Sequence, residues 1–328
     1  AGNDHRLGAN EAPPAIISMF LGDELGAIVD SLISGKEYHS AEAVAMDLGV
    51  AVLPKFLKDN TDRNRTSPFA FTGNKFEFRM PGSGVNLSDC NMILNTAMAK
   101  SLKDFADAMG DVSGAEFEKK AIKYIKQTLT DHQRIIFNGN GYSEEWEKEA
   151  QRRGLANHRT TADALPCLIS QKSIDLFEEF GVLNEAEVRS RYEVKLEKYN
   201  KLLNIEARVM IRMARRTYLP AISDYMADLA SNITTVKSAL SGADMTEHEK
   251  LLNIILNGFN RAAECVRELV KLHDATEAIE DPQEQANAYA CKVIPAMEAL
   301  RKEIDDLECV VERGYWPVPT YNDILFYA

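Results

Sequence analysis

Lys75-Phe76-Glu77-Phe78-Arg79 alternates charged with aromatic side chains, and Met80-Pro81-Gly82-Ser83-Gly84 follows at once. Successive side chains of a β-strand point to opposite faces of the sheet. A strand over 75–79 would therefore carry its charges on one face and its rings on the other. Pro and Gly do not favour continuing a strand, so we predict that it ends there.

The chain changes its pattern on the two sides of this strand. Residues 1–90 are rich in Pro, Gly and Asn, with short apolar runs such as 15–21, Ala-Ile-Ile-Ser-Met-Phe-Leu. Such runs between turn signals favour strands. From about residue 91 the apolar spacing becomes helical, over 92–109, 116–129, 171–179 and 184–230. The sequence thus predicts an α+β fold, with strands and helices followed by a large helical block.

Two segments near the end of the chain have apolar residues in steps of four and three. They are positions 252, 256, 259, 263, 266, 270 and 273, and positions 293, 297, 300, 304, 307 and 311. Asp281-Pro282 separates them, which predicts an antiparallel helical hairpin. Pro295 should start or kink its second arm, and His273 falls on the apolar seam, which indicates a core residue.

The last stretch of the chain cannot be a regular helix, because residues 314–321 read Gly-Tyr-Trp-Pro-Val-Pro-Thr-Tyr. We expect its aromatic side chains to pack back on another part of the protein. We therefore divide the chain into an α+β part at 1–110, a helical region with the hairpin at 111–312, and a tail at 313–328 that packs on the first part.

Composition excludes several classes of protein. The net charge of −12 argues against a nucleic-acid partner, since phosphate binding needs a surplus of Lys and Arg. The five cysteines form no C-x-x-C pair, which argues against a zinc cluster or a disulfide framework and favours a reducing cytoplasm. The sequence contains no apolar run of about 18 residues, the length that a membrane-spanning helix needs, so it predicts no such helix.

Three short segments could carry chemistry. On the strand, Glu77 between Lys75 and Arg79 could bind Mg²⁺ or Mn²⁺ while the cations hold phosphate or carboxylate; a surface ladder of salt bridges is the alternative. The loop Arg63-Asn64-Arg65-Thr66-Ser67-Pro68 offers paired guanidinium groups for a phosphoryl group, or is a solvated basic turn. The segment from Arg6 to Pro14 places Glu11 before Pro13-Pro14, as a flap carboxylate or as an ordinary turn residue.

In this order the three segments resemble the glutamine synthetases. The family pattern N-x-x-x-R-L followed by E-A-P is similar to 3–13, Asn-Asp-His-Arg-Leu-Gly-Ala-Asn-Glu-Ala-Pro, although two residues rather than three separate Asn3 from Arg6 here. The family segment R-N-R-S/T resembles 63–67, and the strand R/K-x-E-x-R-x-P resembles 75–81. Three further features resemble the large type III enzymes: the exact residues at 3–14, the helical block, and the tail Trp-Pro-Val-Pro-Thr-Tyr at 316–321.

The resemblance implies a reaction and a set of roles. It implies ATP-dependent ligation of ammonia to L-glutamate through γ-glutamyl phosphate, in glutamine biosynthesis and nitrogen metabolism. Glu77 would be a metal ligand for Mg²⁺ or Mn²⁺, and Lys75 would lie beside the nucleotide. Arg6 and Arg79 would bind the substrate. Two further residues would be catalytic: Arg65, which also contacts the nucleotide, and the flap residue Glu11.

The resemblance also indicates what lies outside the sequence. The first part, 1–110, would be the C-terminal part of the catalytic domain, with antiparallel strands and helices. The chain opens at Ala1 without Met, and the other metal-binding Glu residues, an H-x-H segment and the N-terminal β-grasp domain would precede it. We expect this piece to be inactive alone and the parent to be a homo-oligomer, since the family forms dodecamers of two hexameric rings. One departure is Ala70, where the family often has Arg.

Two alternatives stay open. A related γ-glutamyl-amine ligase would share these Arg and Glu residues and differ around the ammonia pocket. A helical assembly module would need neither ATP nor metal, so binding of these two distinguishes it from an enzyme.

Overall fold

The computed structural model describes residues 15–38, 45–46, 56–57, 67–82 and 86–326, and the chain divides into two compact units, Ala1–Arg189 and Ser190–Ala328. The strands of the first unit are β1 Met19–Phe20, β2 Ala45–Met46, β3 Phe56–Leu57, β4 Phe69–Phe71 and β5 Phe76–Phe78. Its helices are α1 Gly22–Ser34, α2 Ser88–Met109, α3 Gly114–His132, the 3₁₀ turns η1 Gln133–Ile135 and η2 Leu165–Ile169, α4 Glu144–Arg152, α5 Thr161–Ala164 and α6 Gln171–Glu179.

The strands form one small sheet in the order β1-β4-β5 and a separate pair, β2 with β3. β4 and β5 are antiparallel neighbours in the chain, whereas β1 runs parallel to β4. A parallel pair needs a long connection, and α1 lies within the connection between β1 and β4. The predicted strand at 75–79 is thus confirmed as β5, and the α+β prediction is confirmed as well.

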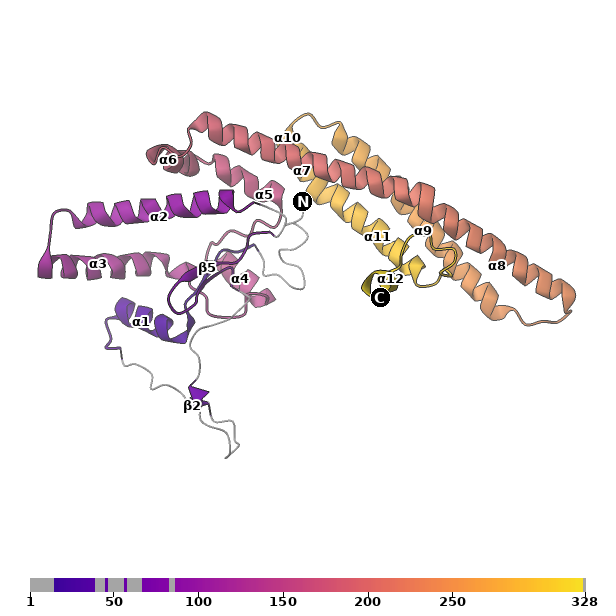
Figure 1. Ribbon diagram of the computed structural model, residues 1–328, viewed down its shortest axis with the longest axis horizontal. Helices are drawn as coiled ribbons and strands as arrows, with labels where there is room; N and C mark the ends of the chain where they lie inside the picture. The colour runs from indigo at the N-terminus through magenta and orange to yellow at the C-terminus, as the bar shows by residue number, and fades with distance from the viewer. Residues whose placement is uncertain (1–14, 39–44, 47–55, 58–66, 83–85, 327–328) are drawn as a thin grey trace. The chain divides into compact units, whose positions relative to one another are not determined.

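Two small cores lie in the described part of the first unit. Ile16, Trp146 and Ala150 form one, with Phe137 stacked on Trp146 at 3.7 Å between ring centroids. The second combines residues of α6 with those that follow it: Ile174, Phe177, Leu183 and Val188. In Figure 1, α2 and α3 lie side by side, and Phe105 of α2 contacts Tyr124 of α3 at 5.4 Å between centroids.

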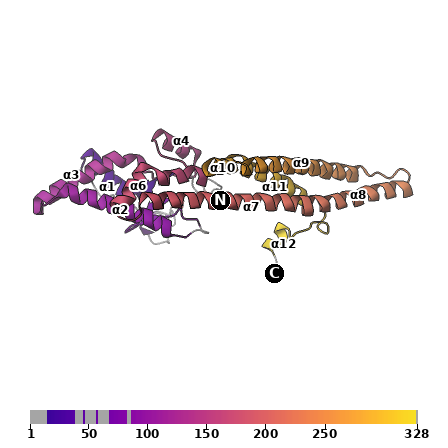
Figure 2. The same ribbon diagram turned by 90° about the horizontal axis from the view of Figure 1, so that it is seen from above.

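The second unit is helical throughout its described part apart from loops. Glu185 begins α7, which crosses the boundary between the units and ends at Met213. The remaining helices are the π-turn η3 Ala214–Tyr218, α8 Leu219–Ala239, α9 Thr246–Glu277, α10 Pro282–Ala288, the π-turn η4 Tyr289–Val293, α11 Ile294–Glu308 and α12 Tyr321–Leu325. Figure 2 shows α9 beside α8 and α11, the helices against which it packs.

Prolines explain the two π-turns. Pro220 follows η3 and Pro295 follows η4, each near the first residue of the next helix. A proline inside a helix lacks the N–H donor and clashes with the carbonyl four residues earlier, at Arg216 and Cys291 here. The wider π-turn falls at that carbonyl, so the helix continues past the proline. Pro295 was predicted to start or kink the second arm, and it is the second residue of α11, which begins directly after the π-turn η4.

α9 and α11 run antiparallel, because Gly258 faces Leu307 and Arg261 is paired with Glu303 at 2.7 Å. Five predicted positions of the second arm are buried: 300, 304 and 307 in α11, 293 at the end of η4 and 311 just after α11. The predicted seam of α9 is right in part: Val266 and His273 are buried, whereas Leu256 is 43% exposed and the other predicted positions are half-buried. The buried stripe of α9 comprises Ile255, Gly258, Ala262, Val266, Leu269, His273 and Thr276.

The tail contacts the helical unit. Tyr315 packs on Tyr225 and donates a hydrogen bond to Asp228, while the ring of buried Trp316 lies 5.3 Å from that of Tyr218. Packing of the tail on 1–110, like the three-part division of the chain, stays a prediction. In the part of the chain that the structure describes, no helix combines the length and apolarity that a membrane span requires.

Candidate functional site

The hairpin of β4 and β5 presents three charged side chains on one face. Glu77 Oε1 lies 3.2 Å from Lys75 Nζ, and Glu77 Oε2 lies 3.2 Å from Arg79 Nη2. Arg79 Nε also donates to Glu77 Oε2, at 3.4 Å. The structure therefore brings together the three strand residues predicted for the site.

The other face of the hairpin fixes this arrangement. Phe69 is paired across the strands with Phe78, and Phe71 with Phe76. Phe69 stacks on Phe76 at 5.7 Å and meets Phe78 edge-on at 6.0 Å between ring centroids. Aromatic pairs of this kind add to the stability of a sheet, so the rings set the register that aligns the charges.

The two cations keep Glu77 ionised. Hydrogen bonding to Lys75, and then to Arg79, holds the pKa of Glu77 below its usual 4.5. The exposed fraction of the side chain rises along the ladder, from 24% for Arg79 through 37% for Glu77 to 65% for Lys75. A charged, solvent-accessible carboxylate between cations can bind a metal ion on one side while the cations bind anions on the other.

A single carboxylate does not hold a divalent ion by itself, since Mg²⁺ requires octahedral coordination by oxygen ligands. Glu77 and the nearby hydroxyl of Thr72 are hard oxygen donors of the right kind, so the residues fit one part of such a site. In the described ranges, the one group of three potential ligands lies elsewhere, on α9: His273, Asp274 and Glu277.

The α9 group does not fit a metal ion well. His273 Nδ1 faces Asp274 Oδ1 at 3.1 Å, and Glu277 accepts a hydrogen bond from Asn204 and lies 4.0 Å from Arg208, a competing cation. The other ring nitrogen of His273 is buried without a hydrogen-bond partner, whereas ligating histidines normally donate from it. The predicted core position of His273 is confirmed, since it is 4% exposed.

Ala70 is the cross-strand partner of Glu77, and it is completely buried. Cross-strand partners point to the same face, so an Arg at this position would lie directly beside Glu77. Because Ala70 has only an uncharged methyl group, it adds no cation beside Glu77, which is paired with two cations of its own strand. The departure from the family pattern thus falls inside the charged cluster.

Sequence analysis missed one member of this cluster. Thr72 Oγ1 donates to Glu77 Oε1 at 3.5 Å and to the carbonyl of Lys75 at 3.3 Å. The strand period does not indicate Thr72, because it reaches Glu77 through the turn at Gly73, whose φ is 93°. Arg6, Glu11 and Arg65 lie outside the described residues.

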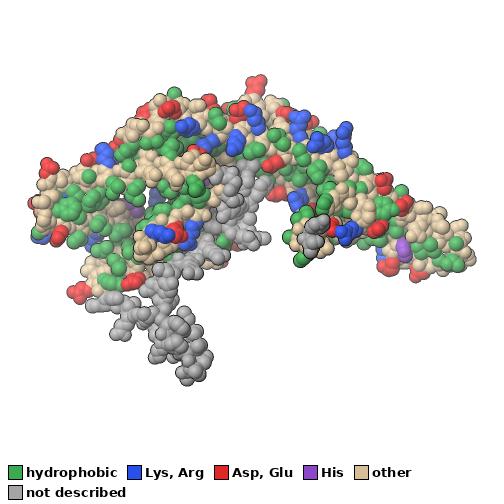
Figure 3. Space-filling view, in the orientation of Figure 1, with side chains coloured by type: hydrophobic (Ala, Val, Ile, Leu, Met, Phe, Trp, Pro, Cys, Tyr) green, Lys and Arg blue, Asp and Glu red, His purple; other side chains and the backbone are tan. Residues whose placement is uncertain are grey.

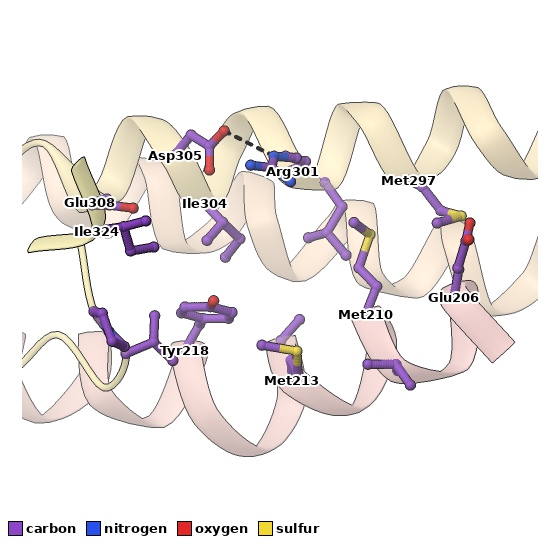
Figure 4. A pocket seen from close by; sticks show the side chains of 15 residues that line it. Glu206, Met210, Met213, Tyr218, Met297, Arg301, Ile304, Asp305, Glu308 and Ile324 are labelled. Carbon is purple, nitrogen blue, oxygen red and sulfur yellow. Dashed lines mark hydrogen bonds and ion pairs between the residues drawn. The ribbon is translucent and has the colours of Figure 1, made fainter. Parts of the chain in front are cut away.

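A second feature that the sequence did not indicate is a cavity of about 600 Å³ in the helical unit. Figure 4 shows Met210, Met213 and Tyr218 facing Met297 and Ile304 across it, with the ion pair of Arg301 and Asp305 at its edge. Its residues come from α7, η3, α11 and the tail, so only the tertiary structure brings them together.

Comparison with known proteins shows which proteins the chain is similar to. Residues 120–237 match the glutamine synthetase C-terminal domain family. The chain is 39% identical over 330 residues to the type-3 glutamine synthetase of Dictyostelium discoideum, an alignment that covers 99% of this chain and 45% of that protein. Over nearly its whole length, the chain is thus similar to part of a glutamine synthetase.

Two bacterial glutamine synthetases are similar over the same extent. That of Butyrivibrio fibrisolvens is 40% identical over 332 residues and that of Bacteroides fragilis 36% over 335 residues, each covering 99% of this chain and 46% of the relative. The chain therefore spans about half the length of these relatives. The glutamine synthetase C-terminal domain match extends from α3 into α8, and the alignments with the relatives also include the charged hairpin.

Proposed function

We propose that this chain contributes one wall of the active site of a glutamate–ammonia ligase that uses ATP. The observation that carries the proposal is the ladder of Lys75, Glu77 and Arg79, which combines an ionised carboxylate with two cations on a rigid hairpin. ATP, glutamate and an acyl phosphate are all anionic, so a site for them needs positioned cations.

In this proposal each residue has one role. Glu77 binds one Mg²⁺ or Mn²⁺ ion, which neutralises charge on the phosphates when it is bound. Arg79 and Arg6 hold the glutamate, and Lys75 lies beside the nucleotide. The relatives are about twice as long as this chain. In the proposal, the further metal ligands and the N-terminal β-grasp part come from the rest of the protein.

The reaction then proceeds in two transfers. The γ-carboxylate of glutamate attacks the γ-phosphorus of ATP, which gives γ-glutamyl phosphate and ADP, while Arg65 stabilises the charge on the transferred phosphoryl group. Glu11 closes over the site and takes a proton from ammonium. Ammonia attacks the acyl carbon and phosphate leaves; the nitrogen loses one proton to the departing phosphate or to water, which gives glutamine.

The test measures γ-glutamyl hydroxamate formed from glutamate, ATP, Mn²⁺ and hydroxylamine, with this chain alone and with the N-terminal part added. We expect activity on mixing only, and a loss of about 100-fold or more in Glu77→Gln, since a metal ligand is removed. Glu280→Gln, which changes an exposed carboxylate in the loop before α10, is the matched control and should keep full activity. Activity of the chain alone, or equal activity of the two variants, would refute the proposal.

Assembly is a second proposed role of the chain, supported by exposed apolar side chains on α2. Met98 and Leu102 are 59% and 61% exposed and lie one helical turn apart. We propose that such faces bury surface in a homo-oligomer, by analogy a dodecamer of two hexameric rings. A sedimentation experiment that finds only monomers of the complete protein would contradict this.

The five cysteines, all free, favour a location in the reducing cytoplasm.

A further inference from the structure

The outer face of α7 carries a continuous strip of exposed apolar and basic side chains. We call it the α7 strip; its members, in steps of three or four residues, are Arg191, Val194, Lys198, Leu202, Ile205, Val209 and Arg212. Residues at this spacing lie on one face of a helix. The strip is about 32 Å long, from the rise of 1.5 Å per residue.

The aliphatic members of the strip are more exposed than core residues of a helical bundle. Val194 and Ile205 are each 58% exposed, Leu202 40% and Val209 37%. On the opposite face of the same helix, Leu196 and Leu203 are almost completely buried. The helix thus has one face that the second unit covers and another that it leaves open.

The cations of the strip are also available. Arg191, Lys198 and Arg212 are exposed, and no ion pair involves any of them in the part of the chain that the structure describes. None of the seven members of the strip is a carboxylate; the three carboxylates between Arg191 and Arg212 in the sequence lie on the adjoining faces of α7. Figure 3 shows several Lys and Arg side chains over α7, on a protein whose net charge is −12.

We infer that the α7 strip is a docking surface for an acidic amphipathic helix of a partner polypeptide. A helix with apolar residues at the same spacing would cover the four aliphatic side chains, and Glu or Asp beside them would meet the three cations. Burial of the aliphatic groups supplies affinity, and the charges set the register and select the partner.

Two other occupants fit the strip less well. A second copy of α7 packed antiparallel about the centre of the strip would place Arg191 opposite Arg212 of its partner at both ends, which is repulsive. An anionic membrane is flat, so it would also approach Glu193, Glu197 and Glu206 on the adjoining faces of α7 and the acidic surface of the protein as a whole.

The test uses two fluorescent peptides of about 22 residues, each a stable helix with Leu at the strip spacing. One carries Glu and the other Lys at the flanking positions. Fluorescence anisotropy with the 328-residue chain should detect binding of the Glu peptide, weakened at high salt, and at least about tenfold weaker binding of the Lys peptide.

Matched variants locate the site. Lys198→Glu with Arg212→Glu should weaken binding of the Glu peptide by about tenfold or more, because two attractive contacts become repulsive. Lys292→Glu with Lys302→Glu makes the same change of charge on η4 and α11, at exposed positions, and should have little effect. Circular dichroism of both variants should match the parent, since all four side chains are exposed.

Three results would overturn the inference. The Lys peptide could bind as well as the Glu peptide, or both double variants could bind equally. Phosphatidylserine vesicles could bind the chain when the Glu peptide does not, which would assign the strip to membranes. Loss of self-association in the Lys198→Glu, Arg212→Glu variant without any peptide binding would assign it to contacts between copies.

Discussion

Gly258 is a buried glycine in the middle of α9, and it lies against Leu307 of α11. A Cβ at Gly258 would lie 2.8 Å from Leu307 Cδ2 and 3.1 Å from its Cγ. Carbon atoms in contact normally lie about 3.5–4.0 Å apart, so Gly258→Ala would force a shift of about 0.7 Å or more. Leu307 is itself buried, which leaves it little room to move.

The net effect is a balance of two terms. Ala is about 1 kcal/mol more favourable than Gly inside a helix, whereas overpacking a core costs about 1–3 kcal/mol. We expect Gly258→Ala to destabilise the hairpin by about 1 kcal/mol. Leu307→Ala alone should cost about 2–5 kcal/mol through lost burial and a cavity. In that background the clash is gone, so Gly258→Ala should stabilise by about 1 kcal/mol, a coupling of about 2 kcal/mol.

Amide hydrogen exchange of peptides from α9 and α11, followed by mass spectrometry, measures these changes locally. Gly258→Ala should speed exchange about fivefold in the parent and slow it about fivefold in Leu307→Ala. Asn257→Ala, at an exposed position of α9, is the control for helix propensity and should slow exchange slightly in both backgrounds. The same effect of Gly258→Ala with and without the Leu307 side chain would refute the reasoning.

Two further predictions concern titration. Lys75→Met should raise the pKa of Glu77 toward 4.5, as carbon NMR would show, because Lys75 is the main cause of its depression and Arg79 the second. Since the folded-state pKa is the lower one, the stabilisation from this carboxylate is present above pH 4.5 and disappears as the pH falls below it. Hydrogen bonding to Asp228 raises the pKa of Tyr315 to about 12, and Asp228→Asn should return it toward 10, measured by tyrosinate absorbance. The contact therefore stabilises the tail below pH 10 and is lost as the pH rises toward 12; an unchanged titration of Tyr315 in Asp228→Asn would contradict this.

The strand of the candidate site was predictable because charged and aromatic side chains alternate along it. Alternation places Lys75, Glu77 and Arg79 on one face, and the hydrogen bonds of the structure follow that alternation. Thr72 was not predictable in the same way, since it reaches Glu77 through the turn geometry at Gly73 rather than through the strand period. The roles of Arg6, Glu11 and Arg65 stay predictions.

The difference between the predicted and the observed buried residues of α9 has a physical cause. The buried stripe contains Gly258, Ala262 and Thr276, small residues that a search for hydrophobic side chains passes over. At Gly258 a small residue is needed because the side chain of Leu307, from the neighbouring helix, fills the space beside it. A helix that packs against both α8 and α11 also carries apolar residues on several faces, so more than one stripe satisfies the period.

The distribution of tryptophan has a practical consequence. The chain contains two, and each unit has one in a buried position, Trp146 and Trp316. Trp146 lies under the guanidinium of Arg153 and against Phe137, whereas Trp316 has a tyrosine ring beside it. Their emission should therefore respond differently to quenchers and to denaturant, and replacing either indole by Phe would leave a single intrinsic fluorophore. Each half of the molecule thus carries its own optical reporter, with which the unfolding of the two halves can be followed separately in one sample without any added label.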